Sequence, residues 1–488
     1  MGFKDFMRRK LRSFLEIENP QANTITLSDL NDFETECYIN KVWSWGDKEA
    51  IEQLYKQLST HSTQLNFWSA VPSMGIVKRH TGLPGQIVDI LSALVISDLN
   101  DITISQRQVE WENMQDRGIK IEDLLDDAIK STLITGDGAF RISINTGISP
   151  YPIVDFVAGE DVEYHYTKKV ITEVVFKSVI KHGWKKYQFE ETYGYGYIAS
   201  KLYDGDNEVP LSNIPQTENI QPMVEFDKSF MMAVPLMFFK SKRFAGRGKS
   251  IYAGKHDSFD ALDECWSQWM EAVRKGRAVK YIPTSLLPRN PDNGRFLAPN
   301  DFDNDFIELE SDMVEGREAK IDMEQPAIPT DNYLQTYITA LDLCLQGIIS
   351  PSTLGIDTKK LDNADAQREK EKTTLYTRNK IVSTLQEVLP VLINNIFKVY
   401  DTYNHKPLND YEVDVPFGEY ANPSFESQVE TISKAKTSGI MSVEAAIDEL
   451  YGDTKDKEWK AEEAERIKAQ NGIMMTDEDS AGDQMDAF

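Results

Sequence analysis

One stretch constrains the fold more than any other part of the chain. Residues 359–397 read KKLDNADAQREKEKTTLYTRNKIVSTLQEVLPVLINNIF. The first half is charged and has no apolar stripe, whereas the second half repeats apolar residues at helical spacing, at Ile381, Leu385, Val388, Leu389, Leu392 and Ile396. Pro390 interrupts the stripe, and a proline inside a helix removes one backbone donor and bends the axis. The pattern therefore predicts one long helix over 365–403, kinked at Pro390, that begins in water and ends in a packed core.

Composition excludes some classes of protein and favours others. The chain has 488 residues, of which 41% are hydrophobic, enough to build a core shared by several subdomains. Its 53 basic and 79 acidic side chains give a net charge of −26. Such a surface repels phosphate, so tight non-specific DNA binding is not expected, although DNA could slide past without being held.

The cysteines and the first residues bear on compartment and membrane contact. Three scattered cysteines, Cys37, Cys265 and Cys344, form no CxxC pair and indicate a reducing compartment. The sequence contains no run of 18 apolar residues, so a transmembrane helix is not expected. The beginning, MGFKDFMRRKLRSFLE, is basic and amphipathic, and lacks the apolar run of a secretory signal. It is expected to dock on the protein itself, with a membrane surface as the alternative.

The pattern along the chain changes repeatedly between helix and strand. Residues 28–60 and 83–97 have helical periodicity, and 120–145 changes from helix to strand at a Gly-Asp-Gly break. Short alternating segments continue through 150–235. The economical interpretation is an α+β fold.

Two helices with facing seams are expected next. A helix over about 250–277 carries one apolar seam, and a returning helix over about 331–348 carries a second, with Asp331 as its N-cap. The seam residues, which we predict to pack together, are Phe259, Leu262, Trp266, Trp269, Val273, Leu334, Ile338 and Leu341. Between the helices, prolines and a DNG turn indicate a small β-rich insertion rather than a helix.

A search for catalytic motifs finds one near match. FAGRGKS (244–250) precedes a helix, as a phosphate-binding P-loop does, but the first glycine of GxxxxGK[ST] would fall on Arg243. The six histidines form no HxxxH or HExxH pair that would predict a zinc site. We therefore expect no enzyme activity, no metal and no cofactor.

The sequence resembles the portal proteins of tailed bacteriophages, in the form found in phages of Gram-positive hosts. The resemblance covers about residues 80–470 and rests on four stretches in a consistent order. They are STLITGDGAFRI, GRGKSIYAGKHDSFDALDECWSQWMEAVRKGRAVKYIP, GIISPSTLGIDTKKLDNADAQREKEKTTLYTRNKI and SGIMSVEAAIDELYGDTKDKEWKAEEAERIKAQ.

The resemblance implies a portal-type subunit with the following organisation. An N-terminal helical arm (1–60) precedes an α+β wing (61–245), a first stem helix (246–280), a β-rich clip (281–330) and a second stem helix (331–348). A tunnel loop (349–364), the long kinked channel helix (365–403), a return strand of the wing (404–425), a helical crown (426–470) and an acidic disordered tail (471–488) follow.

The resemblance also implies a function and a set of partners. Portal subunits form a ring, commonly of twelve, at one capsid vertex of the virion, after assembly in the bacterial host cytoplasm. Terminase, whose large subunit hydrolyses the ATP, packages double-stranded DNA through the ring, the DNA is later ejected through it, and the head-tail adaptor joins it. The major capsid protein and a scaffold are further expected partners, and a membrane is not.

The same resemblance implies roles for particular residues. Channel-facing residues, which would meet DNA only in transit and non-specifically, are Asp357, Lys359, Lys360, Asp362, Asp365, Arg368 and Lys372. Arg289 and Arg295, beside the turns of the clip, are expected to contact terminase or adaptor, or else an acidic stretch of a neighbouring subunit.

Two alternatives from other classes stay open. One is an NTP-dependent enzyme that uses the GRGKS stretch. The other is a monomeric scaffold, or a membrane-associated interaction protein, that uses the basic N-terminus.

Overall fold

The computed structural model describes residues 32–59, 66–70, 76–145, 147–276, 279–283, 306–309, 322–324, 327–356, 364–418, 425–451 and 457–482. The chain divides into two units: the first comprises Met1–Leu354 with Thr373–Phe417, and the second comprises Gly355–Lys372 with Gly418–Phe488. The chain is a mixed α+β protein, as the sequence predicts.

Helices supply most of the core of the first unit. In chain order they are α2 (Phe33–Trp45), α3 (Lys48–Ser59), α4 (Leu83–Ser97), α5 (Gln108–Arg117), α6 (Ile121–Thr135), α7 (His256–Lys275), α8 (Thr330–Leu345) and α9 (Ala364–Tyr403) from Thr373 onward. Pro84 stands in the first turn of α4, where its missing N–H costs no hydrogen bond. Helices α2 and α4 both pack on α6, which lies over the sheet that contains β2.

The described strands form four sheets. The longest sheet is antiparallel and runs β4 (Val162–Thr167), β5 (Val170–His182), β6 (Lys185–Gly194), β7 (Tyr197–Asp204) and β8 (Asn207–Val209), with β9 (Met223–Glu225) also on β7. The second places β2 (Asp137–Ser143) between β3 (Ile153–Ala158) and β10 (Ala233–Met237). A short pair joins β1 (Thr103–Ile104) to β14 (Val413–Asp414), and a small sheet orders β12 (Phe306–Leu309), β11 (Val279–Pro283) and β13 (Asp322–Glu324).

The core end of α9 is buried as its sequence pattern predicts. Ile381, Leu385, Leu389, Leu392 and Ile396 are each fully buried, and Val388 is half-buried. Two arginine side chains, one buried and one partly exposed, fasten the helix to the rest of the unit. Arg378 Nη2 lies 2.6 Å from Asp98 Oδ2, and Arg107 Nη1 lies 2.7 Å from Asp401 Oδ2. The helix continues through Pro390, whose missing N–H leaves one carbonyl without its helical partner; the kink there stays a prediction.

The second unit contains α10 (Phe425–Thr437), α11 (Val443–Tyr451) and α12 (Lys457–Gly482). Helices α11 and α12 are joined by the edge-on rings of Tyr451 and Trp459, whose centroids are 4.9 Å apart, and by Lys460 Nζ, 2.6 Å from Asp448 Oδ1. The tail expected to be disordered from residue 471 is helical as far as Gly482. Strong helix formers precede it, and extending an existing helix costs far less than nucleating one.

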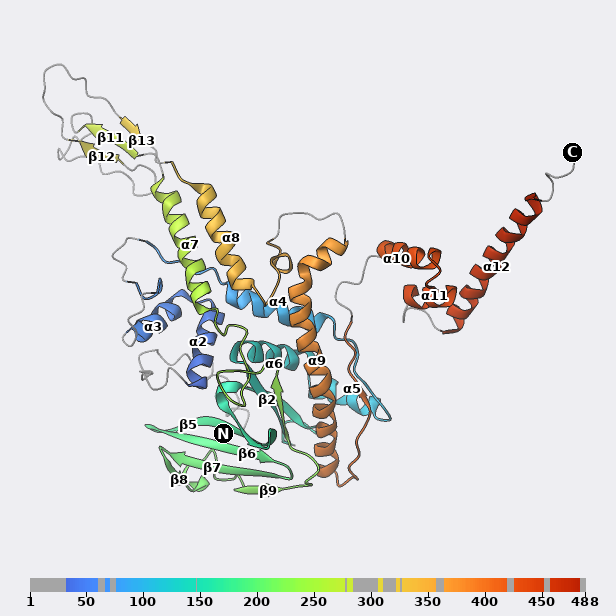
Figure 1. Cartoon of the computed structure of the whole chain (residues 1–488). Coiled ribbons are helices and arrows are strands. Elements are labelled where there is room, and N and C mark those ends of the chain that lie inside the picture. Colours follow the sequence, from blue (N-terminus) through green and yellow to red (C-terminus); the bar gives the residue numbers. More distant parts are fainter. Residues whose placement is uncertain are drawn as a thin grey trace, which may run out of the picture. The chain divides into compact units, whose positions relative to one another are not determined.

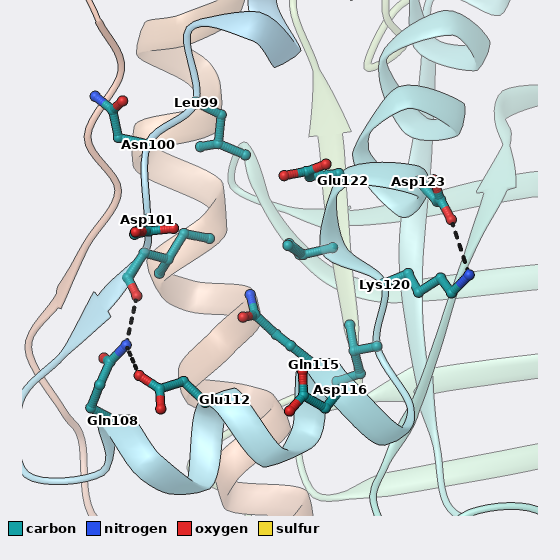
Figure 2. Close-up of a pocket in the computed structure, with 13 residues that line it drawn as sticks. Leu99, Asn100, Asp101, Gln108, Glu112, Gln115, Asp116, Lys120, Glu122 and Asp123 are labelled. Carbon is teal, nitrogen blue, oxygen red and sulfur yellow. Dashed lines mark hydrogen bonds and ion pairs between the residues drawn. The ribbon is translucent and has the colours of Figure 1, made fainter.

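An open cleft of about 510 Å³ lies in the first unit, between the segment that follows α4, helix α5 and the start of α6 (Figure 2). Carboxylates of Asp101, Glu112, Asp116 and Glu122 line it. Beneath them lie the side chains of Ile102, Ile119 and Ile121, which are already buried within the chain.

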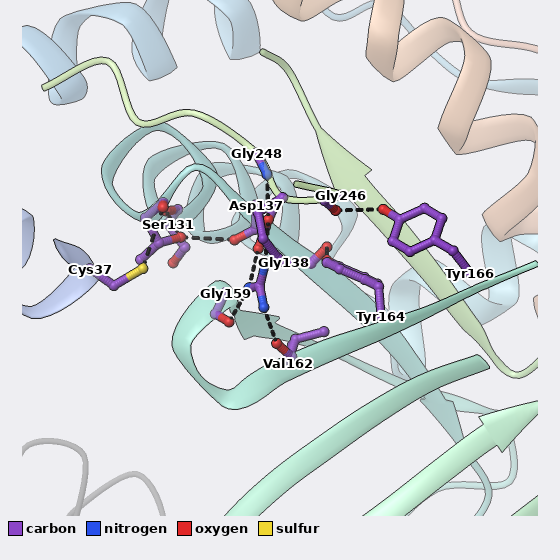
Figure 3. Close-up of polar contacts among 12 residues, drawn as sticks. Cys37, Ser131, Asp137, Gly138, Gly159, Val162, Tyr164, Tyr166, Gly246 and Gly248 are labelled. Carbon is purple, nitrogen blue, oxygen red and sulfur yellow. Dashed lines mark hydrogen bonds and ion pairs between the residues drawn. The ribbon is translucent and has the colours of Figure 1, made fainter. Parts of the chain in front are cut away.

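A buried ion pair joins the two glycine-containing motifs of the sequence (Figure 3). Asp137, between Gly136 and Gly138, is completely buried, and its Oδ1 accepts from Arg247 Nη2 at 2.7 Å. Its Oδ2 accepts from Arg247 Nε at 3.0 Å and from the Gly248 amide at 2.6 Å. A bidentate, charge-assisted contact of this kind fixes both distance and orientation.

The remaining donors of Arg247 and its flat face are also used. The guanidinium donates to the carbonyls of Gly159 at 2.5 Å and Val162 at 2.8 Å. It stacks 3.8 Å from the ring centroid of Phe33 in α2. Because these acceptors come from separate segments, one arginine ties α2, the α6–β2 turn and the start of β4 to the loop that precedes α7. We call the contacts of Asp137 and Arg247 the Asp137–Arg247 junction.

Glycine is required where the two motifs touch. Gly136 has φ +108°, a backbone conformation that side chains disfavour. A Cβ on Gly248 would overlap the carbonyl oxygen of Gly136. The GDG and GRG sequences are therefore the two halves of one close backbone contact.

We predict that Asp137→Asn lowers the free energy of unfolding by about 3–5 kcal/mol, because it leaves the Arg247 cation buried without a counter-charge. Urea denaturation followed by tryptophan fluorescence measures the change. Lys185→Ala is the control, since it removes an exposed pair, Lys185 with Asp204, and should leave the midpoint in place. Equal effects of the two substitutions would contradict the assigned importance of the junction.

Candidate functional site

Helices α7 and α8 lie side by side as an antiparallel hairpin, and β11 and β13 connect to their far ends (Figure 1). An aromatic ladder holds the upper part of the hairpin together. The ring of Trp269 stacks on Tyr333 with centroids 6.4 Å apart, and Trp266 meets Tyr337 at 5.9 Å. Aromatic pairs of this geometry add about 0.5–1.5 kcal/mol each beyond the area that they bury.

Only some of the predicted seam residues lie in the contact between α7 and α8. Phe259, Leu262 and Leu341 are buried, and Trp266 and Trp269 are half-buried. Val273, Leu334 and Ile338 are instead exposed, by 45%, 43% and 41%. The upper half of α8 turns Tyr333 and Tyr337 toward α7, one residue earlier than the expected Leu334 and Ile338, and one residue is a rotation of about 100°.

The exposed apolar residues of the hairpin leave a surface that this chain's described residues do not cover. Leu334 and Ile338 are four residues apart and so lie on the same side of α8. Together with Val273 on α7 we call these residues the hairpin apolar set. The N-cap expected at Asp331 is also displaced: α8 begins at Thr330, so Asp331 lies in its first turn, where a carboxylate favours the helix dipole.

The base of α7 is fixed by two buried carboxylates, those of Asp260 and Asp263. Asp263 Oδ1 accepts from the Thr81 amide at 2.9 Å, and its Oδ2 lies 2.7 Å from His80 Nδ1 and accepts from Trp68 Nε1 at 3.1 Å. Asp260 accepts from the amides of Phe67 and Trp68. Burial raises the pKa of Asp260, and the two amide bonds act in the opposite direction. The hairpin thus begins on a rigid base.

His256, the first residue of α7, is partly buried, and its Nε2 lies 2.8 Å from Asn40 Oδ1. Burial lowers its pKa to about 4, because the charged imidazolium loses its hydration there. In the unfolded chain His256 binds a proton below a pH of about 6.5, whereas in the folded chain it does so only below a pH of about 4. His256 therefore lowers the free energy of unfolding as the pH falls from about 6.5 to about 4.

We predict that His256→Gln abolishes this part of the acid sensitivity. Urea titrations at a series of pH values from 7 to 4 should show wild type losing up to about 3 kcal/mol more than the variant, since a shift of one pKa unit corresponds to about 1.4 kcal/mol. Stability profiles that stay parallel across this range would mean that His256 is not buried in its neutral form.

Two hydrogen bonds join the residues that follow α8 to the part of α9 that begins at Thr374. The Ser350 amide donates to Thr374 Oγ1 at 2.9 Å, and Thr377 Oγ1 donates to the Ile348 carbonyl at 2.6 Å. Between them the chain makes a short 3-10 turn, η7 (Pro351–Leu354). These bonds bring the start and the end of the intervening stretch to the same place on the first unit.

Most of the residues predicted to face DNA or partners lie outside the described residues or are described by backbone alone. Asp357, Lys359, Lys360, Asp362, Arg289 and Arg295 lie outside the described residues. Asp365 and Arg368 belong to the first turns of α9, and Lys372, two turns on, is exposed. Their channel role stays a prediction.

The GRGKS stretch does not offer the free amides that a phosphate needs. The Gly248 amide donates to Asp137, and the Lys249 amide donates to the Phe239 carbonyl at 2.7 Å. The Arg247 amide donates to the Phe244 carbonyl. These bonds disfavour the nucleotide-binding alternative. The sequence signal that could have revealed the real role is the pairing of two Gly-x-Gly motifs, one with an acid and one with a base at its centre.

Among the residues that the structure describes, no three His, Cys, Asp or Glu side chains come together in a group suited to a metal ion. None of the described helices combines the length and the apolar character needed to cross a membrane.

No protein-family model matches the chain, and no curated protein sequence matches it. Several solved structures match the chain in fold. One, described as "Neck of native GTA particle computed with C12 symmetry", is 12% identical, covers 76% of this chain and 89% of its own, and has a TM-score of 0.38. A second, "Virion of native gene transfer agent (GTA) particle", is 12% identical over 78% of this chain and 92% of its own, with a TM-score of 0.37.

A third structure, "Neck of empty GTA particle computed with C6 symmetry", is 13% identical, covers 79% of this chain and 94% of its own, and has a TM-score of 0.37. At such identities and TM-scores, the likeness does not bear on what this chain does.

Proposed function

We propose that this chain is a portal-type subunit of a phage head-tail connector. In this proposal, copies of the chain form a ring at one capsid vertex, double-stranded DNA passes through the ring during packaging and ejection, and the role is structural rather than enzymatic. The observation that supports it best is the order of parts: the α7–α8 hairpin carries the small β11–β13 sheet at its far end and leads through a clamped turn into α9. The sequence resemblance places the same parts in the same order.

The hairpin apolar set supports association with further copies. Val273, Leu334 and Ile338 are each more than two-fifths exposed in the single chain, although the sequence around them keeps a seam pattern. In a ring, the neighbouring subunit would cover them, and burying three such side chains contributes several kcal/mol per contact, at about 25 cal/mol per Å². Because a ring repeats the contact in every subunit, the gain recurs around it.

The charge distribution supports weak contact with DNA. The net charge of −26 would keep a channel wall largely acidic, and the two lysines of the 357–363 stretch would give each subunit only sparse cationic contacts. A ring with many strong phosphate contacts would hold DNA through the cooperative release of counterions. Sparse lysines therefore suit a conduit through which DNA must slide.

The remaining partners follow from the same proposal. Arg289 and Arg295 would lie at the end of the ring that meets the terminase large subunit during packaging, and afterwards the head-tail adaptor. The major capsid protein, with or without scaffold, would surround the ring in the virion, and assembly would take place in the host cytoplasm. No membrane and no cofactor enters this account.

We predict that Leu334→Glu combined with Ile338→Glu prevents ring formation, since two carboxylates would have to be desolvated at the subunit contact. Sedimentation velocity of the purified chain should show large assemblies for wild type and monomers of 55.6 kDa for the variant. Val109→Glu, on α5 and 70% exposed, is the matched control and should assemble normally. Intact rings from the Leu334 and Ile338 variant would contradict the proposed contact.

We further predict that Lys359→Ala with Lys360→Ala leaves assembly unchanged but impairs packaging or retention of DNA, because the sparse cationic contacts would be lost. The measurement is the amount of nuclease-protected DNA per particle. Lys185→Ala with Lys186→Ala, an adjacent pair on β6, is the control and should package normally. Normal packaging and retention in the first variant would remove the assigned role of the loop.

A further inference from the structure

The cleft beside α5 has a mainly polar lining with an excess of negative charge (Figure 2). Five carboxylates and one lysine line it, and Lys120 Nζ lies 3.9 Å from Asp123 Oδ2. Within the described part of the chain, Asp101, Asp116 and Glu122 have no basic side chain within salt-bridge distance. A concave surface of this kind concentrates negative potential.

The spacing of these carboxylates argues against a metal ion as the ligand. They come from the segment after α4, from α5 and from the start of α6, and no three of them gather into a group suited to a metal among the described residues. Divalent cations need several oxygens at about 2.0–2.6 Å from one point. Carboxylates spread along an open cleft instead suit an extended partner that carries several cations.

The first fifteen residues of the chain have the complementary chemistry. MGFKDFMRRKLRSFL contains five basic side chains and one acidic one, and the cleft lining contains five acidic side chains and one basic one. Phe3, Phe6, Met7, Leu11 and Phe14 repeat at helical spacing. The segment is thus predicted to be an amphipathic helix whose basic face complements the carboxylates of the cleft.

The connection is long enough for the segment to reach the cleft of its own chain. Cys37, in the second turn of α2, donates through Sγ to the carbonyl of Thr135 at the end of α6. The cleft lies at the other end of α6. Helix α6 has 15 residues and is therefore about 22 Å long, at 1.5 Å per residue. Residues 16–31 can extend to about 50 Å at 3.3 Å per residue, so the span leaves ample slack.

We infer that the N-terminal segment, residues 1–15, docks in the acidic cleft of the same chain. Its basic side chains face Asp101, Glu112, Asp116 and Glu122. The inference goes beyond the proposed ring, because a monomer contains both the segment and the cleft.

Cross-linking in the full-length chain tests this docking. The background carries Cys265→Ser, because Cys37 and Cys344 are buried. The test pair is Ser13→Cys with Gln115→Cys, two uncharged positions, of which Gln115 lines the cleft. The control pair is Ser13→Cys with Gln188→Cys, on the exposed side of β6. A short bismaleimide should link the test pair within one chain at least about tenfold more than the control pair, since docking raises the local concentration far above that of a free tether.

Charge variants establish the cause of the cross-link. Asp101→Lys with Glu122→Lys should reduce the yield to the control level, and adding Arg8→Glu with Arg12→Glu should restore it. Raising the salt concentration from about 0.05 M to about 0.5 M should lower the wild-type yield, because exposed charges are then screened.

Several results would overturn the inference. One is a test-pair yield no higher than the control, and another is a yield that the reversal of cleft charges leaves unchanged. Cross-links that form only between mixed chains, each carrying one cysteine, would place the segment in another copy. Flotation of the full-length chain with phosphatidylserine vesicles, without the cross-link, would assign the segment to a lipid surface instead.

Discussion

The Asp137–Arg247 junction is the contact on which the rest of the first unit depends. A fully buried carboxylate accepts three hydrogen bonds, and its arginine partner donates to two further carbonyls and stacks on Phe33. Burying both charges is costly, and only geometry this complete offsets the cost. Because the junction joins α2, the α6–β2 turn, β4 and the loop before α7, it sets where α7 begins. The contacts of Asp260 and Asp263 then fix the base of α7.

The parts of the fold that could be predicted are those fixed by local periodicity. The helix at 83–97, the change from helix to strand at Gly136 and the buried stripe of α9 follow from spacing alone, because each is decided by residues near in sequence. The junction could not be predicted in this way. Its partners are 110 residues apart, and GRGKS read locally resembles a phosphate loop, whereas its amides serve the protein itself.

The hairpin illustrates a second limit of reading a sequence. A seam of Leu334, Ile338 and Leu341 is a sound prediction of an apolar face, but it does not say which molecule covers that face. Within one chain, Tyr333 and Tyr337 take the contact with α7, and Leu334 and Ile338 remain exposed. Exposed apolar surface of this kind is costly in an isolated subunit, and the proposed ring explains it economically.

The most direct test of the ring proposal is the mass of the purified full-length protein, measured by light scattering, with negative-stain images of the same fraction. The account predicts a mass that is a large whole multiple of 55.6 kDa, near twelve, and particles with a central hole. A monomer that stays monomeric after capsid protein and scaffold are added, at concentrations where related assemblies form, would contradict it.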